Sequence, residues 1–281
     1  MSVWYPDFTP AFRCRAEACR HSCCRGWEID VDEDSAALYR QLPGELGEAL
    51  RTALFEDGEG WHFRLTEEER CPFLQPDGLC RLIRELGEEA LCDICALHPR
   101  FFQELGEHEL WGLGLSCETV TALLLERDAL RFHCEESGEE TDLAGLLRRV
   151  GLAVPEELLR YAPRTDERRR RELLARFRDT EPIDEAWPRE LEALSAGPLP
   201  AQADAARVQR VYEYLFFRQI EKLGEYPAET VADYAAAMTD LLVLWDALEP
   251  DTAEHLRRLS EQIEYSTENV ERLMHEAKSE E

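Results

Sequence analysis

Cysteines are the residues of this 281-residue chain best suited to chemistry. Nine of the ten fall within residues 14–117, in two groups. The first group is Cys14, Cys19, Cys23 and Cys24, and the second is Cys71, Cys80, Cys92, Cys95 and Cys117. Thiolate sulfur is a soft, negatively charged donor that binds zinc and iron–sulfur clusters well. We therefore expect the two groups to fold onto each other and to hold a metal centre.

The spacing of the cysteines favours metal binding over inert burial. Cys92-x2-Cys95 lets two sulfurs reach one metal from a single turn, and Cys19-x3-Cys23 does the same along one helical face. A buried thiol that acts only as a small hydrophobe is the alternative, and it suits Cys134 and Cys92. The expected metal ligands are Cys14, Cys19, Cys23, Cys24, Cys71, Cys80, Cys95 and Cys117. Cys92 and His98 are less favoured as ligands. We expect His98 to hydrogen-bond to a metal ligand and not to bind the metal itself.

Four other side chains near the cysteines are candidates for catalysis or cofactor binding. Asp30 and Glu118 each lie close in sequence to a cysteine group and are candidate proton acceptors, or else ordinary exposed or capping acids. Trp27 is a candidate wall of a cofactor pocket, or else a core residue. Arg100 is a candidate partner for a cofactor carboxylate, or else for one of the many acids.

Charge and composition narrow the classes of function. The net charge is −28 and the acidic residues are spread on both sides of residue 135. Such a surface repels nucleic acid and anionic lipid and favours cationic partners, although solubility alone also explains it. The first residues do not resemble a signal peptide, and no apolar run reaches the roughly 18 residues of a membrane span. We expect a cytoplasmic protein without a transmembrane segment, in which dense cysteines indicate metal or redox chemistry.

Familiar nucleotide and hydrolase motifs are absent from the sequence. No strand is followed by a glycine-rich loop that opens a helix, and the sequence contains no phosphate loop and no nucleophile elbow. The Cys-x3-Cys-x2-Cys motif of radical enzymes that use S-adenosylmethionine is also absent, because Gly26 stands where its third cysteine would be.

The pattern of apolar residues predicts a mainly α fold in two regions. Residues 1–135 form a cysteine-rich metal-binding region with short strands or hairpins, and residues 136–281 form a helical bundle without metal ligands of its own. The acidic stretch 135–140 marks the boundary. We expect residues 1–13 to be an aromatic arm that packs onto the first cysteine group. The expected hairpin spans residues 101–115, and the expected helical stripes include residues 208–220, 231–248 and 256–273.

Several motifs around the cysteines resemble those of the flagellin lysine N-methylases. They are Cys14, Cys19, Cys23-Cys24-x-Gly-Trp27, Cys71-Pro-Phe-Leu74, Asp77-Gly-Leu-Cys80, Leu86-Gly-Glu-Glu89, Cys95-x2-His-Pro-Arg100, Leu115-Ser-Cys-Glu118, Tyr214-Leu-Phe-Phe-Arg218 and Ile263-Glu-Tyr-Ser-Thr-Glu-Asn269. That family often has a residue other than cysteine at the place of Cys92 and a tyrosine at that of His98. The first half also resembles, more loosely, cysteine-rich zinc- or iron-chelating domains.

The resemblance implies an S-adenosylmethionine-dependent lysine N-methyltransferase that acts on flagellin, a protein of the bacterial flagellum. It also implies a 4Fe–4S cluster held by cysteines, with S-adenosylmethionine as methyl donor. The alternative is a non-catalytic zinc- or iron-binding module whose helical half binds a partner, because zinc would use the same sulfurs.

Overall fold

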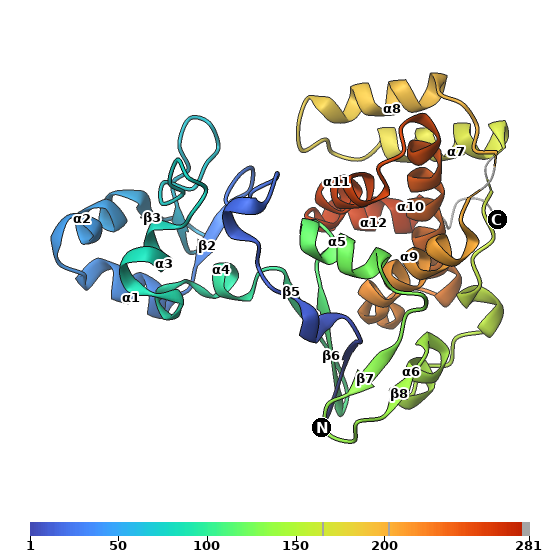
Figure 1. The fold of residues 1–281 in the computed structure, drawn as a ribbon, viewed down its shortest axis with the longest axis horizontal. Helices are drawn as coiled ribbons and strands as arrows, with labels where there is room; N and C mark the ends of the chain where they lie inside the picture. The colour runs from blue at the N-terminus through green and yellow to red at the C-terminus, as the bar shows by residue number, and fades with distance from the viewer. Residues whose placement is uncertain (165, 202, 277–281) are drawn as a thin grey trace. The chain divides into compact units, whose positions relative to one another are not determined.

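The chain folds into two compact units, and one of them is inserted into the other. The computed structural model describes residues 1–164, 166–201 and 203–276. Residues Arg13–Pro99 form the cysteine unit, and Met1–Phe12 together with the chain from Arg100 onward form the main unit (Figure 1). This division differs from the expected boundary at residues 135 and 136. The acidic stretch there is a hairpin turn inside the main unit, where Cys134 N–H donates to Glu139 O at 2.9 Å.

A five-stranded sheet in the main unit contains the first strand of the chain. Its strands, in spatial order, are β5 (Arg100–Leu105), β6 (His108–Leu113), β1 (Ser2–Pro6), β7 (Phe132–Cys134) and β8 (Glu140–Thr141). β1 is parallel to β6 and antiparallel to β7. Trp4, Phe8 and Phe12 are therefore buried in the core of the main unit. The expected packing of this aromatic arm onto the first cysteine group is wrong, because its strand pairs with partners more than 100 residues away.

The expected hairpin is confirmed as β5 and β6. The two strands pair from Arg100 with Leu113 to Leu105 with His108, and Gly106 takes a positive φ of +60° in the turn. Gly112 is required for another reason, since a Cβ on it would lie 2.1 Å from the ring of Phe101. An aromatic side chain thus crosses directly over the backbone of β6.

Helices make up the rest of the main unit, and the expected mainly α class is confirmed. They are α5 (Glu118–Leu125), α6 (Leu143–Arg149), α7 (Glu167–Arg178), α8 (Ala186–Ala196), α9 (Ala205–Arg218), α10 (Ala228–Leu248), α11 (Thr252–Glu264) and α12 (Thr267–Glu276). The helix α10 is buried along most of its length and packs against α9, α11 and α12. Among the described residues of the expected bundle, 136–281, the only strand is β8, which belongs to the five-stranded sheet, and those after Thr141 contain no strand. Residues 165, 202 and 277–281 of the expected bundle lie outside the described residues.

The expected apolar stripe over residues 256–273 belongs to two helices, α11 and α12, and not to one. The break falls at Tyr265 and Ser266, and the Ser266 hydroxyl accepts a hydrogen bond from Asn269 N–H at 3.2 Å. Ser266 therefore satisfies a donor at the start of α12, as a capping residue does.

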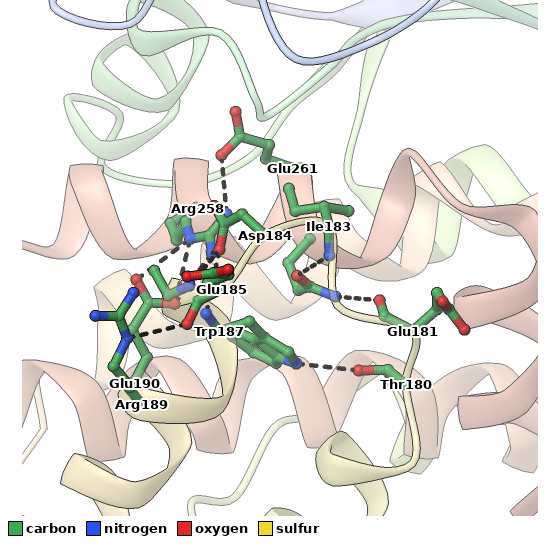
Figure 2. A network of polar contacts seen from close by, with 12 residues as sticks. Thr180, Glu181, Ile183, Asp184, Glu185, Trp187, Arg189, Glu190, Arg258 and Glu261 are labelled. Atoms are coloured by element: carbon green, nitrogen blue, oxygen red, sulfur yellow. Dashed lines mark hydrogen bonds and ion pairs between the residues drawn. The ribbon is translucent and has the colours of Figure 1, made fainter. Parts of the chain in front are cut away.

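A polar network fixes the link between α7 and α8 against α11 (Figure 2). The guanidinium of Arg258 is buried and pairs with Asp184 at 2.7 Å and with Glu190 at 3.2 Å. The indole N–H of Trp187 donates to the hydroxyl of Thr180 at 3.2 Å. A buried arginine is tolerated only when carboxylates pair with it, so these contacts hold the link in one conformation.

The cysteine unit combines short helices with a three-stranded sheet. Its helices are α1 (Glu33–Gln41), α2 (Gly44–Ala53), α3 (Arg81–Leu86) and α4 (Asp93–Leu97), and its strands are β2 (Ile29–Val31), β3 (Leu54–Glu56) and β4 (Trp61–Phe63) (Figure 1). The strand order is β2-β4-β3. Leu42 is extended before Pro43, which separates α1 from α2. No helix among the described residues has the length and apolar character needed to cross a bilayer.

Candidate metal centre

The loop that follows the first cysteine group pairs with the start of the second group. Arg25 and Arg70 form an antiparallel bridge, and Cys71 N–H donates to Cys24 O at 2.9 Å. A second bridge joins Leu74 to Cys80. These backbone contacts bring Cys24, Cys71 and Cys80 together, so the expected folding of one cysteine group onto the other is confirmed for these residues.

A tight turn places the segment between Cys14 and Cys19 beside the second group. Gly78 takes a positive φ of +83°, and a Cβ on it would lie 3.3 Å from Cα of Glu17. Glu17 belongs to a short 3-10 turn, Ala16–Ala18, that Cys19 follows directly. The turn before Cys80 therefore packs against the backbone between the first two cysteines.

The short helix α4 presents the Cys-x2-Cys pair. Cys92 precedes the helix as its N-cap residue, and Cys95 N–H donates to Cys92 O at 3.0 Å. A carboxylate oxygen of Asp32 accepts from Asp93 N–H at 2.9 Å, while the other accepts from Ser35 N–H at 2.8 Å. Asp32 thus joins the start of α4 to the start of α1 and fixes the direction of both cysteines.

Five thiols lie close enough to change one another's ionisation: Cys24, Cys71, Cys80, Cys92 and Cys95. A charge on Cys24 raises the pKa of Cys71, Cys80 and Cys95. Cys71 and Cys92 are buried in the core of the cysteine unit, and the other three pack against it. We call these five residues the thiol cluster. Cys92, which the sequence suggested as an inert thiol, lies within it.

Hydrogen bonds and burial divide the thiols into two kinds. A hydrogen bond from Cys23 lowers the pKa of Cys24 to about 7, and a hydrogen bond from Cys95 lowers the pKa of Cys92. The same bond to Cys92, and then burial, raises the pKa of Cys95. Burial raises the pKa of Cys71 to about 12 and also raises that of Cys80. A metal bound to all five thiols would have to displace the protons of Cys71, Cys80 and Cys95, whose pKa values are raised.

The remaining expected ligands are not among these five thiols. Cys23 is exposed but hydrogen-bonds to Cys24, so it borders the thiol cluster, while Cys14 is exposed and Cys19 is half-buried in the same unit. Cys117 belongs to the main unit, where it is the N-cap residue of α5. Cys134 is buried in the main unit and donates to Glu136 at 3.4 Å, and its lack of a metal role stays a prediction.

Trp27 and His98 lie side by side in the cysteine unit. Their ring centroids are 6.2 Å apart, and the indole N–H of Trp27 donates to Cys23 O at 2.6 Å. Burial lowers the pKa of His98 to about 4, so its imidazole is neutral at physiological pH. A half-buried aromatic and a neutral imidazole thus border the loop that carries Cys23 and Cys24.

The other three candidates lie on other elements of the fold. Asp30 lies on β2 with an exposed carboxylate, 3.0 Å from the ring of His62. Glu118 is buried in the first turn of α5, and Arg100 begins β5 with its guanidinium 5.3 Å from the ring of Phe12. Glu118 and Arg100 both belong to the main unit.

Two residues near the thiols were not recognised from the sequence. Tyr39 is buried, donates to Ala90 O at 2.6 Å, and has its pKa raised by burial and by charges on Cys92 and Cys95. Asp32, whose carboxylate accepts from Asp93 N–H, was not among the candidates either. The i, i+7 spacing of Asp32 and Tyr39 on one helical face was the signal available for both.

Comparisons with known proteins support the resemblance to lysine N-methylases. The chain is 31% identical over 134 residues to "Lysine-N-methylase" of Salmonella choleraesuis, which covers 44% of this chain and 33% of that protein. The lysine N-methylase of Salmonella typhimurium is 30% identical over the same length. "Flagellar biosynthetic protein FliU" of Salmonella muenchen is 29% identical, with 78% of that protein covered.

The match is partial on both sides. The chain spans about a third of the length of the two lysine N-methylases that it matches. No family model matches the chain. No solved structure matches it either.

Proposed function

We propose that the chain is a protein lysine N-methyltransferase that acts on flagellin, with S-adenosylmethionine as the methyl donor and a cysteine-bound 4Fe–4S cluster. The observation that carries the proposal is the similarity to lysine N-methylases over 44% of the chain. The FliU name of a third relative supports a flagellar substrate. The thiol cluster supports a bound metal group, because buried thiols that share one another's charge are stabilised by a cation.

The donor set suits an iron–sulfur group, because cysteine thiolates are its usual ligands. Five thiols of the cysteine unit interact electrostatically, and zinc would use the same thiols. The resemblance to the flagellin lysine N-methylases favours the iron–sulfur group. Such a cluster would supply an iron at which the amino and carboxylate groups of S-adenosylmethionine can bind.

The chain's own residues would hold this group and shield it from water. Phe63 and Phe73 pack edge to face with centroids 5.0 Å apart, and Tyr39 stacks on Phe63 at 5.7 Å. All three side chains are buried in the same core as Cys71 and Cys92. Cys24, with its pKa of about 7, is half ionised near neutral pH and so needs little free energy to become a ligand.

The acceptor lysine must lose its proton before its amine can attack the methyl group. Of the two expected proton acceptors, Asp30 keeps an exposed carboxylate in the cysteine unit, and Glu118 belongs to the main unit. Asp32 is the carboxylate that interacts with Cys92, but two backbone N–H groups already bind it and hold its pKa below the usual range against the effect of burial. Asp30 also lies on the face of the three-stranded sheet opposite the core that contains Cys71 and Cys92, so it does not face the thiol cluster.

The test measures bound metal and methyl transfer on the same anaerobically purified protein. We expect a brown protein with about four irons per chain, and S-adenosylmethionine-dependent mass gain on flagellin. Cys24→Ser and Cys95→Ser should lose most of the iron and the activity. Cys134→Ser is the matched control, since this buried thiol lies in the main unit, and it should keep both.

Two results would contradict the proposal in different ways. Zinc without visible colour, together with no methyl transfer, would favour the non-catalytic metal-binding module. Iron retained in full by both Cys24→Ser and Cys95→Ser would show that the thiol cluster is not the metal site, whatever the activity.

A further inference from the structure

The outer face of the three-stranded sheet carries a row of side chains with no role in the thiol cluster. The register pairs Asp30 of β2 with His62 of β4, and His62 with Phe55 of β3. Neighbouring residues on a strand point to opposite faces, and Ile29 and Phe63 point into the core that contains Cys71 and Cys92. His62 and the thiols therefore lie on opposite sides of the sheet.

His62 is buried even though it lies on the outer face. It is 4% exposed, and carboxylates approach both of its ring nitrogens. Nδ1 lies 3.0 Å from Asp30 Oδ1 and 3.5 Å from Glu28 Oε1, and Nε2 lies 3.2 Å from Asp57 Oδ1. The ring of Phe55 covers it, with centroids 5.4 Å apart. An imidazole enclosed by three carboxylates is a set of metal-binding groups and not a hydrophobic contact.

This group of side chains lacks positive charge. No arginine or lysine within the described part of the chain forms an ion pair with Glu28, Asp30 or Asp57. The nearby Arg64 lies over the ring of Phe55 instead. Three carboxylates around one imidazole leave an excess of negative charge even when the ring is protonated, which favours a cation at this place.

The β3–β4 turn fixes one of the carboxylates. Asp57 Oδ1 accepts from Glu59 N–H at 2.8 Å and from Gly60 N–H at 3.3 Å. These bonds hold Asp57 against His62, whereas Asp30 lies on β2 and Glu28 directly precedes that strand. A ligand bound here would tie β2 to the turn between β3 and β4.

We infer that Glu28, Asp57 and His62, with Asp30 beside them, bind one divalent transition-metal ion. One ligand atom from each of the first three lies within 4.8 Å of the others, and ligands on one ion at about 2.1 Å lie at most about 4.2 Å apart. A small movement of the exposed carboxylates closes this gap. Imidazole with carboxylates suits ions such as Mn²⁺, Fe²⁺ and Zn²⁺, whereas the soft thiols select iron–sulfur groups or zinc. This site does not depend on the proposed methyltransferase function.

Manganese is the probe, because Mn²⁺ prefers oxygen and nitrogen to thiolate and so reports on this site and not on the thiol cluster. Mn²⁺ is titrated into the full anaerobic protein, and free Mn²⁺ is followed by electron paramagnetic resonance. We expect one Mn²⁺ to bind per chain, and Zn²⁺ to displace it. The bound Mn²⁺ should show a hyperfine coupling to nitrogen that changes when histidine is labelled with ¹⁵N.

His62→Gln and Asp57→Asn should each weaken Mn²⁺ binding by at least about tenfold, since even the outer partners of metal ligands commonly contribute that much. His62→Gln should also remove the nitrogen coupling. Glu56→Gln is the matched control, because Glu56 directly precedes Asp57 and its replacement also removes one negative charge from the sheet. This variant should bind Mn²⁺ normally.

Binding that is absent, unchanged in both variants, without nitrogen coupling, or weakened equally by Glu56→Gln would overturn the inference. Circular dichroism checks the fold of each variant. Asp57→Asn replaces a partly exposed side chain and keeps the turn acceptor, so it remains informative even if His62→Gln does not fold. The ¹⁵N-histidine experiment on the unaltered chain needs no variant.

Discussion

Replacement of Asp240 by asparagine should destabilise the main unit strongly. Asp240 lies within α10, and its side chain is 0% exposed. Its Oδ2 pairs with Nε of Arg169 at 2.8 Å, and its Oδ1 accepts from the hydroxyl of Tyr161 at 2.6 Å. The Arg169 side chain is 7% exposed, and its Nη2 is buried without a hydrogen-bond partner among the described residues. Asp240 is therefore the charge that keeps this guanidinium in the core.

The magnitude follows from the buried charge that is left behind. Asparagine has nearly the same shape but no charge, so Arg169 would remain buried and uncompensated, which costs about 3–5 kcal/mol. The matched control is Arg168→Ala, because Arg168 is the preceding residue, is 84% exposed, and pairs with Glu172 one turn along the helix. Loss of such an exposed pair costs about 0.3–0.5 kcal/mol.

Urea unfolding followed by circular dichroism measures both changes. A third variant, Asp240→Leu combined with Arg169→Met, should recover much of the loss, because an apolar replacement of a whole buried pair is often neutral. If Asp240→Asn costs no more than Arg168→Ala, the pair is not held in a dry core and the argument fails. Bound metal should stay unchanged, since the pair lies in the main unit.

Three further predictions concern the turn at Gly78, Asp7 just after the first strand, and the acidic surface. Gly78→Ala should destabilise the cysteine unit by about 1–2 kcal/mol, because Gly78 has a positive φ. It should also lower the amount of bound metal, because the added Cβ would press on Glu17. Gly58→Ala is the control, since a Cβ on Gly58 meets open space, and it should change neither result in the same unfolding and metal assays. Burial raises the pKa of Asp7 despite the opposing charge of Arg127, so its ionised form favours the unfolded chain. Asp7→Asn should therefore raise the melting temperature at pH 7, and the gain should vanish as the pH falls below the ordinary carboxyl pKa of 3.8; a gain that persists there would contradict this assignment. If the charge of −28 attracts lysine-bearing flagellin, methyl transfer should slow as salt shortens the screening length to about 8 Å and below, whereas a rate indifferent to salt would assign the charge to solubility alone.

Local patterns predicted the elements of this protein well, because those signals lie within a few residues. Gly78 and Gly106 lie in turns with positive φ, and Gly87 takes one after α3. Pro43 separates two helices, as its missing N–H requires. The density of cysteines also identified the region in which the thiol cluster forms.

Long-range pairing was not predictable from those patterns. The partner of β1 is set by residues more than 100 positions away, so the position of Trp4 could not follow from its neighbours. The acidic stretch after Cys134 looked like a linker, because a hairpin turn and a linker use the same polar residues and glycine. Cys92 looked inert because burial and a lowered pKa cannot be distinguished in a sequence.

The insertion of the cysteine unit sets an order of events during synthesis. A ribosome produces the chain from its first residue, and β1 then waits for β6 and β7, its two neighbours in the sheet. The whole of Arg13–Pro99 emerges in that interval, with every residue of the thiol cluster already present. Domains generally fold as units while the chain is being made. The cysteine unit can therefore fold, and the proposed metal group can bind to it, before the main unit exists, while the first strand is still unpaired.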